Sequence, residues 1–368
     1  MLLLWAEVLR TCVVAAAFPV SVIWAAMCQQ QTHVAWVGLH LHDIIQPSFY
    51  FLVGASCWLS LLRSRGETVR RTTARMLSLI ALGILLRSID SLQVDPTETL
   101  IQIALAYPFV SLIARQPRRV WYLAGAGILL GYWLLFALTP LPPADFDYQE
   151  VHVPSDWLQV HGLSGFAAHW QKNSNVAWRV DRWFVPFLPG NVGHTGFRNG
   201  VTTLNFVPSI ATMLLGLFAA DRLTSDKSTM VKAQTLVLAG ASLAALGYAL
   251  SATGLCPVVK AIWTPSWVLV SGGICLVVLA AFHVAVDGLG SAKALFPLRV
   301  IGMNAIVAYS IYWLYQGMAF NAIRRVVGSE VFNAFGAAVA PAVYGLAVMF
   351  TYWLVLWVLY RRRIFARL

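Results

Sequence analysis

Long apolar runs separated by short polar segments dominate this chain. Runs of about 18 or more mostly apolar residues are long enough to cross a hydrocarbon core of about 30 Å as helices. We therefore predict an all-α polytopic membrane protein with about ten transmembrane helices. The predicted spans centre on Val8–Met27, Ile44–Leu62, Met76–Ser88, Thr99–Ala114, Val120–Leu138, Phe206–Asp221, Ala233–Ser251, Ser266–Val286, Val300–Phe320 and Ala337–Tyr360.

The amino-acid composition also indicates a membrane protein. Hydrophobic residues make up 59% of the 368 residues and charged residues only 11%, and the mean hydropathy is +0.70. These values exclude an ordinary soluble domain. The first apolar run is expected to be a transmembrane helix rather than a cleaved leader, because further apolar runs follow it.

The basic residues predict an orientation. The net charge is +11, and most of the 26 Lys and Arg residues lie in alternate short loops. Lys and Arg accumulate at the cytoplasmic ends of spans, so both termini are predicted to be cytoplasmic. The basic residues are spread among loops instead of forming one patch, and we expect no nucleic-acid partner. Examples are Arg70, Arg71 and Arg75; Arg115, Arg118 and Arg119; and Arg361, Arg362 and Arg363.

The five cysteines are interpreted as small apolar core residues. They lie mostly within apolar runs and show no CxxC spacing. We therefore predict neither disulfides nor metal ligation from them.

One predicted loop is long, about residues 139–205, and it is expected on the external face. It interleaves tryptophans with amide, carboxylate and basic side chains, a combination that suits a sugar with apolar faces and many hydroxyls. The alternative is an aromatic belt at the membrane interface. The candidate substrate-binding residues of this loop are His169, Trp170, Lys172, Asn173, Asn175, Asp181 and Trp183.

Titratable side chains cluster at the mouth of the second apolar run. Four of them lie within eleven consecutive positions: His33, His40, His42 and Asp43. Ionisable groups at membrane depth are costly enough to indicate function. Metal ligation by His40, His42 and Asp43 is one alternative. It lacks a second ligand cluster, so we expect no metal. His40 and His42 are not chosen as catalytic residues, since residues at i and i+2 do not face together on a helix.

The same stretch resembles a known family. His33, Trp36, Gly38, Asp43, Phe49, Phe51 and Gly54 match a motif of the transmembrane acetyltransferases typified by heparan-α-glucosaminide N-acetyltransferase. Cys256–Gly273 and Phe296–Ser310 resemble two further segments of that family. The FAAHW run that precedes Gln171 resembles the loop of its short bacterial members, which lack the lumenal domain. The resemblance covers almost the whole chain and implies a single transmembrane acyltransferase domain over residues 1–368.

The chain departs from the family pattern at three places. Arg10-Thr11 stands where the family has Arg-Gly, Ser21 lies near an expected Asn, and Gln102 replaces an Arg. If that Arg contacts the donor in relatives, the donor site of this protein is built differently.

The resemblance implies transfer of acetyl from cytoplasmic acetyl-CoA to an amine or hydroxyl of an external amino sugar or glycan. His33 is expected to be the catalytic base or the acetyl carrier, and Asp43 is expected to orient it. Relatives also imply a bacterial inner membrane and a homodimer. A proton-coupled sugar or organic-acid transporter that uses the same histidines is the alternative function. A non-enzymatic scaffold would not need His33 and Asp43 at this place.

Further residues are assigned to the donor and the acceptor. Arg10, Arg75 and Arg299 are candidates for holding the donor phosphates, with plain topological charges as the alternative. Asn304 is a candidate donor to the thioester oxygen, with a helix-to-helix hydrogen bond as the alternative. The candidates for shaping the acceptor site are Trp36, Lys260, Trp263 and Trp267, and interfacial anchoring is the alternative for the last three.

Overall fold

The computed structural model describes residues 5, 7–63, 69–328 and 330–366. In this part of the chain, helices and their connections form the whole structure apart from one isolated bridge between Val37 and Val259. The prediction of an all-α fold is therefore confirmed for the described residues.

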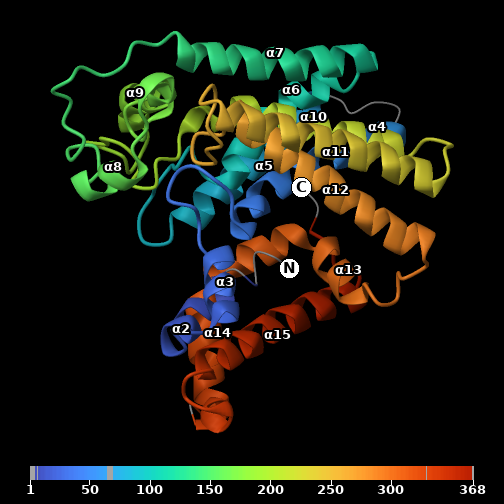
Figure 1. The fold of residues 1–368 in the computed structure, drawn as a ribbon. Coiled ribbons are helices and arrows are strands. Elements are labelled where there is room, and N and C mark those ends of the chain that lie inside the picture. Colours follow the sequence, from blue (N-terminus) through green and yellow to red (C-terminus); the bar gives the residue numbers. More distant parts are fainter. Residues whose placement is uncertain (1–4, 6, 64–68, 329, 367–368) are drawn as a thin grey trace. The chain divides into compact units, whose positions relative to one another are not determined.

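Short helices are interspersed with long ones along the chain (Figure 1). In chain order they are α2 (Thr11–Ala17), α3 (Val22–Gln31), α4 (Ile45–Arg63), α5 (Val69–Arg87), α6 (Thr99–Ile113), α7 (Arg118–Ala137), α8 (Ser155–His161), α9 (Val176–Phe184), α10 (Phe206–Leu223), α11 (Thr229–Ala252), α12 (Pro265–His283), α13 (Phe296–Met303), α14 (Ala305–Val327) and α15 (Ala340–Arg361). Single turns connect or extend them: η1 (Leu41–Ile44), η2 (Gly165–Trp170), η3 (Val185–Phe187), η4 (Thr203–Asn205), η5 (Val284–Gly288) and η6 (Glu330–Phe335).

Among the described residues, six helical segments are long and apolar enough to cross a membrane, which supports the predicted membrane character. They coincide with six of the predicted runs. The segments are Leu41–Arg63, Arg118–Ala137, Thr203–Leu223, Thr229–Ala252, Pro265–Gly288 and Ala340–Arg361.

The first predicted span is not one helix, so that prediction is wrong. The run Val8–Met27 contains α2 and α3, which pack against each other on either side of a break at Phe18–Ser21. Pro19 in this break has no backbone N–H to continue α2. The Ser21 hydroxyl then accepts a hydrogen bond from the Trp24 amide at 3.5 Å and caps α3.

Three other predicted spans also fold as shorter or more polar helices. The helix α5 carries Arg70, Arg71 and Arg75 within its first turns, and α6 has only 15 residues. The run Val300–Phe320 is divided at Asn304 into α13 and α14. The described residues therefore do not reach the ten spanning helices that the pattern predicts.

The chain divides into two compact units, which we describe separately. Unit 1 comprises Met1–Val34, His40–Ile45 and Ala285–Leu368, and unit 2 comprises Ala35–Leu39 and Gln46–Val284. The single domain predicted over residues 1–368 stays a prediction.

In unit 2, glycines allow the helix backbones to approach closely. The neighbouring helices α11 and α12 (Figure 1) meet where a Cβ on Gly240 would press against the Gly273 carbonyl. At the contact of α4 and α10, a Cβ on Gly54 would overlap the backbone of Met213. Small residues at such crossings are typical of helices that pack inside a membrane.

The long segment of residues 139–205 belongs to unit 2 and builds a small core of its own. Val151, Val153 and Trp178 are buried together, and Phe146 and Tyr148 pack against them. The segment therefore folds as a structured insertion around α8 and α9.

Unit 1 contains a disulfide between Cys12 of α2 and Cys28 of α3. The prediction of no disulfide is wrong for this pair, because the break after α2 folds α3 back and brings the two thiols together. Cys57, Cys256 and Cys275 are buried thiols outside this disulfide. Disulfides persist in oxidising compartments, which disagrees with the cytoplasmic placement predicted for this segment. The orientation of the chain stays a prediction.

Candidate functional site

A histidine and an aspartate of unit 1 form the centre of the candidate site. His33 Nδ1 lies 2.6 Å from Asp43 Oδ1. The Asp43 side chain is completely buried, whereas 51% of the His33 side chain is exposed. The predicted pairing of these two residues is therefore present in the structure.

The turn η1 fixes the orientation of the carboxylate. Asp43 Oδ2 accepts hydrogen bonds from the backbone amides of His40 at 3.0 Å and Val34 at 3.4 Å. The Asp43 amide donates to the His40 carbonyl at 3.0 Å in return. This capping arrangement joins the residue before the turn to its third position. A carboxylate that accepts three hydrogen bonds stays ionised and keeps its place.

The hydrogen bonds assign the tautomer of His33. An ionised carboxylate only accepts hydrogen bonds, so we place a proton on His33 Nδ1. Nε2 then carries the lone pair of the ring. An accessible imidazole whose other nitrogen is held by a buried carboxylate is the arrangement of a general base in acyl transfer.

A second histidine, His42, packs directly on the first. The rings of His33 and His42 are stacked with centroids 4.0 Å apart. His42 Nδ1 lies 2.6 Å from the Gln31 carbonyl oxygen, and its Nε2 lies 3.1 Å from Glu7 Oε1. Both partners are acceptors, so His42 is held between a carbonyl oxygen and a carboxylate.

Glu7 holds the outer nitrogen of His42 in place. Tyr312 Oη donates to Glu7 Oε2 at 2.8 Å. Burial raises the pKa of the Glu7 carboxyl, but the hydrogen bonds from His42 and Tyr312 outweigh burial and hold that pKa below its ordinary value. Glu7 is therefore a carboxylate at neutral pH, and it interacts electrostatically with both His42 and His33.

Gln31 anchors the site to the disulfide-bonded hairpin. Its side-chain oxygen accepts hydrogen bonds from the amide and the hydroxyl of Thr11, and its Nε2 donates to the Trp5 carbonyl at 2.7 Å. The Gln31 carbonyl at the end of α3 holds His42, as described above. The hairpin of α2 and α3 therefore sets the position of the stacked rings.

Glu7, His42 and Tyr312 were not predicted as site residues. Sequence spacing did not predict that His42 stacks on His33. The extended segment between α3 and η1 brings the two rings together. Glu7 and Tyr312 lie 305 positions apart, and no sequence signal joins them.

Of the three arginines predicted to bind the donor, two lie in unit 1 and one lies in unit 2. In unit 1, the Arg10 guanidinium lies 4.3 Å from the centre of the Phe320 ring, and Arg299 lies 6.0 Å from that of Tyr360. In unit 2, Arg75 donates from Nη1 to a tyrosine hydroxyl at 2.6 Å. Their phosphate-binding role stays a prediction.

Asn304 uses its amide to hold the C-terminal segment of unit 1. Its Nδ2 donates to the Ile364 carbonyl at 3.0 Å, and its Oδ1 accepts from the Ala366 amide at 3.1 Å. The side chain is 1% exposed. The alternative role predicted for Asn304 was a hydrogen bond between helices. In the structure its partner is the C-terminal segment instead of a neighbouring helix.

Three predicted acceptor residues come together in unit 2. Trp36 Nε1 donates to the Trp170 carbonyl at 3.1 Å, and the Trp36 ring packs edge-on against Trp157. Lys172 Nζ lies 4.7 Å from the centre of the same Trp157 ring. Burial lowers the pKa of Lys172. Trp36, Trp170 and Lys172 are all buried, at 2%, 0% and 7% exposure, and their sugar-binding role stays a prediction.

Three polar side chains that we predicted as sugar ligands form hydrogen bonds to the backbone of the loop itself. Asn173 and Asn175 are buried and donate to backbone carbonyls at 2.7 and 2.9 Å. Asp181 is 1% exposed and accepts from the Thr203 amide at 3.0 Å. Burial raises the pKa of Asp181 to about 7. These contacts stabilise the loop, and the sugar-binding role of the three residues stays a prediction.

The remaining candidates differ in exposure. His169 Nδ1 bonds to the Thr139 carbonyl at 2.9 Å, and Trp183 is 72% exposed. Trp263 and Trp267 are fully buried, and Lys260 lies in the same turn as Trp263, whose amide donates to the Lys260 carbonyl. Complete burial makes interfacial anchoring a poor description of the two tryptophans.

Metal ligation needs several donors in one place. Within the described ranges of the chain, no three His, Cys, Asp or Glu side chains gather in a way that would hold a metal ion. The dyad described above uses hydrogen bonds for its geometry.

Comparison of the sequence with models of known protein families gave no match, and comparison with curated proteins found no similar sequence. The likeness to transmembrane acetyltransferases therefore rests on the three motifs, and the function follows as a proposal.

Proposed function

We propose that this protein is a membrane acyltransferase in which His33 is the general base and Asp43 its orienting partner. The observation that carries the proposal is the 2.6 Å contact between a half-exposed imidazole and a fully buried carboxylate. Acyl transfer needs a neutral imidazole that can take a proton from a weak nucleophile.

The proposed donor is acetyl-CoA, and the acceptor is an amine or hydroxyl of an external sugar. His33 Nε2 removes the acceptor proton while the acceptor nitrogen or oxygen forms a bond to the acetyl carbon. The C–S bond of the thioester breaks, and the proton on Nε2 passes to the departing thiolate. Asp43 stabilises the imidazolium that exists between these proton transfers.

The membrane setting gives this reaction its purpose. The phosphates of acetyl-CoA do not cross a bilayer, so a protein with apolar spanning helices can pass the acetyl group alone to an external acceptor. The proposal includes cytoplasmic termini, a bacterial inner membrane and a homodimer.

The test uses purified protein in liposomes, labelled acetyl-CoA and glucosamine. We expect His33→Gln to lower kcat/KM by about 10²–10⁴-fold, the contribution typical of general base catalysis. Asp43→Asn should lower kcat by a similar factor, because the amide does not stabilise an imidazolium. His283→Gln, at the end of α12 in unit 2, is the matched control and should retain activity. Circular dichroism and gel filtration check that each variant folds.

Full turnover in His33→Gln would reject the proposal. A proton relay is the second candidate, because four titratable groups touch one another in the site: His33, Asp43, His42 and Glu7. Uptake of unmodified sugar into the same vesicles, driven by a pH gradient and lost in His33→Gln, would establish a transporter instead.

A further inference from the structure

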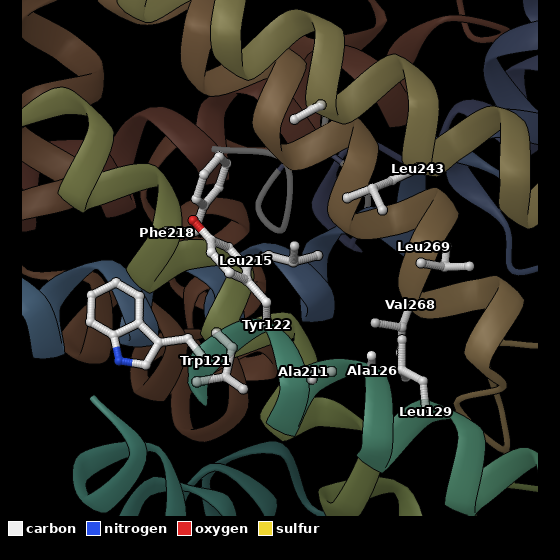
Figure 2. A pocket seen from close by; sticks show the side chains of 13 residues that line it. Trp121, Tyr122, Ala126, Leu129, Ala211, Leu215, Phe218, Leu243, Val268 and Leu269 are labelled. Carbon is white, nitrogen blue, oxygen red and sulfur yellow. The ribbon is translucent and has the colours of Figure 1, made fainter. Parts of the chain in front are cut away.

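Unit 2 contains an apolar groove between four of its helices, α7, α10, α11 and α12. The groove encloses about 290 Å³. Its lining carries almost no polar surface, and all four helices are among the segments able to cross a membrane. Figure 2 shows Tyr122 and Phe218 at one end of the groove and Leu129, Val268 and Leu269 at the other.

The groove is long enough for a stretch of extended hydrocarbon. The lining residues of α7 run from Trp121 to Leu129, about 12 Å along the helix axis at 1.5 Å per residue. Gly125 and Ala126 form its floor on this side, and a Cβ on Gly125 would meet only Leu214 at 3.8 Å. Small side chains therefore leave space in the middle of the groove.

The guanidinium of Arg222 lies at the end of the groove that Tyr122 and Phe218 form. Arg222 Nη2 donates to the Tyr122 hydroxyl at 3.2 Å, and the guanidinium lies 5.2 Å from the centre of the Phe218 ring. The side chain of Arg222 is 38% exposed. An apolar groove with a basic side chain over one end fits a ligand with a hydrocarbon body and an anionic head.

The Arg222 guanidinium still has hydrogen-bonding capacity. Its Nε is buried and donates no hydrogen bond within the described part of the chain, and Asp221 Oδ2 lies 4.0 Å away. Asp221 instead accepts from Arg118 Nη2 at 2.7 Å. Two arginines against one carboxylate leave a net positive charge at this end. A phosphate group bound at the exposed part of the guanidinium would neutralise that charge.

We propose that the groove binds one acyl chain of an anionic phospholipid, with the lipid phosphate at Arg222. This inference is independent of the acyl-transfer proposal, because the groove and the His33–Asp43 dyad share no residue. The Trp121 ring packs edge-on against Trp58 at this end of the groove.

The test measures lipids that remain bound to the purified protein by native mass spectrometry. The probe is an equal mixture of phosphatidylglycerol and phosphatidylcholine with identical chains. We expect the wild type to retain phosphatidylglycerol with a preference of about fivefold, the effect of one basic residue at a membrane surface. Ala126→Trp should fill the groove and abolish this retention. Arg222→Gln should remove the preference while both lipids still bind.

Two variants serve as controls. Leu123→Trp adds the same side chain to α7 at a residue that is 70% exposed and does not line the groove. Lys227→Gln removes one charge from the loop after α10. Both should retain phosphatidylglycerol as the wild type does. Equal retention in wild type and Ala126→Trp, or no headgroup preference in the wild type, would overturn the proposal.

A photoactivatable phosphatidylglycerol gives a second readout in the wild type that does not depend on a variant folding. It should label peptides that contain Trp121–Leu129 and Ala211–Phe218. Labelling confined to other helices would reject the site. Displacement of the lipid by oleate at equal concentration would show that the groove prefers a fatty carboxylate, and would overturn the assignment to a phospholipid.

Discussion

The rings of His33 and His42 stack with their centroids 4.0 Å apart and their planes inclined by 27°. Hydrogen bonds distinguish the two rings. His33 faces one carboxylate through Nδ1, whereas His42 lies between a carbonyl oxygen and the Glu7 carboxylate. His33 therefore bonds to a buried carboxylate, whereas both nitrogens of His42 have acceptors beside them.

The variant His42→Phe tests whether His42 positions His33. Phenylalanine keeps an aromatic ring against His33 but removes the hydrogen bonds to the Gln31 carbonyl and to Glu7. The His33 ring should be held less firmly, so kcat/KM should fall by about tenfold, which corresponds to about 1.4 kcal/mol of transition-state stabilisation. The variant Glu7→Gln keeps an acceptor for His42 and should lose less. Unchanged kcat/KM in His42→Phe would contradict a positioning role for His42.

Reduction of the disulfide should expose two cysteines that are otherwise protected. Denatured protein treated with a maleimide mass tag should gain three tags, on Cys57, Cys256 and Cys275, and reduced protein should gain five. Replacing both Cys12 and Cys28 by Ser should lower the free energy of unfolding by about 3 kcal/mol, the value for a closed loop of this length. Five tags without reduction would contradict the bond.

Glycines at the α4–α10 contact should resist substitution. Gly54→Ala and Gly216→Ala place a Cβ against the carbonyls of Met213 and Phe51. Each should lower the free energy of unfolding in detergent micelles by about 1–3 kcal/mol, the cost of overpacking. Gly127→Ala in α7 is the matched control, because a Cβ there meets nothing within 4 Å. It should stabilise the helix by about 0.5–1 kcal/mol.

Burial of Asp181 should make the stability of the protein depend on pH. Its pKa of about 7 in the folded protein lies above the value near 3.9 of an unfolded chain. The folded state therefore holds a proton that the unfolded state releases. The stability from this group is complete below about pH 4 and is lost as the pH rises to about 7.

The variant Asp181→Asn measures that contribution. The amide oxygen can still accept the hydrogen bond from Thr203 but does not ionise. The thermal midpoint of the wild type should fall between pH 5 and pH 8, and the variant should show a flatter dependence. Parallel curves for the two proteins would mean that Asp181 is ionised throughout.

The sequence predicted the central pair of the site but not its surroundings. His33 and Asp43 lie ten positions apart, and their motif predicted the pairing that the structure contains. The polar residues of the long loop were predicted as sugar ligands because they alternate with tryptophans. In the structure, Asn173, Asn175 and Asp181 satisfy backbone groups of the loop itself. Composition does not distinguish a side chain that binds a ligand from one that holds a loop.

Hydrophobic content alone determined that this is an all-α protein with membrane-spanning helices, because backbone groups in lipid must bond within their own helix. Six of the predicted spans have the expected position for that reason. Tertiary structure decided where apolar runs break, at Phe18–Ser21 and at Asn304, because Pro19 and the contacts of Asn304 interrupt helices that hydropathy treats as continuous. It also decided the partners of His42. Contacts between residues as distant as Glu7 and Tyr312 arise from packing, which a local pattern does not contain.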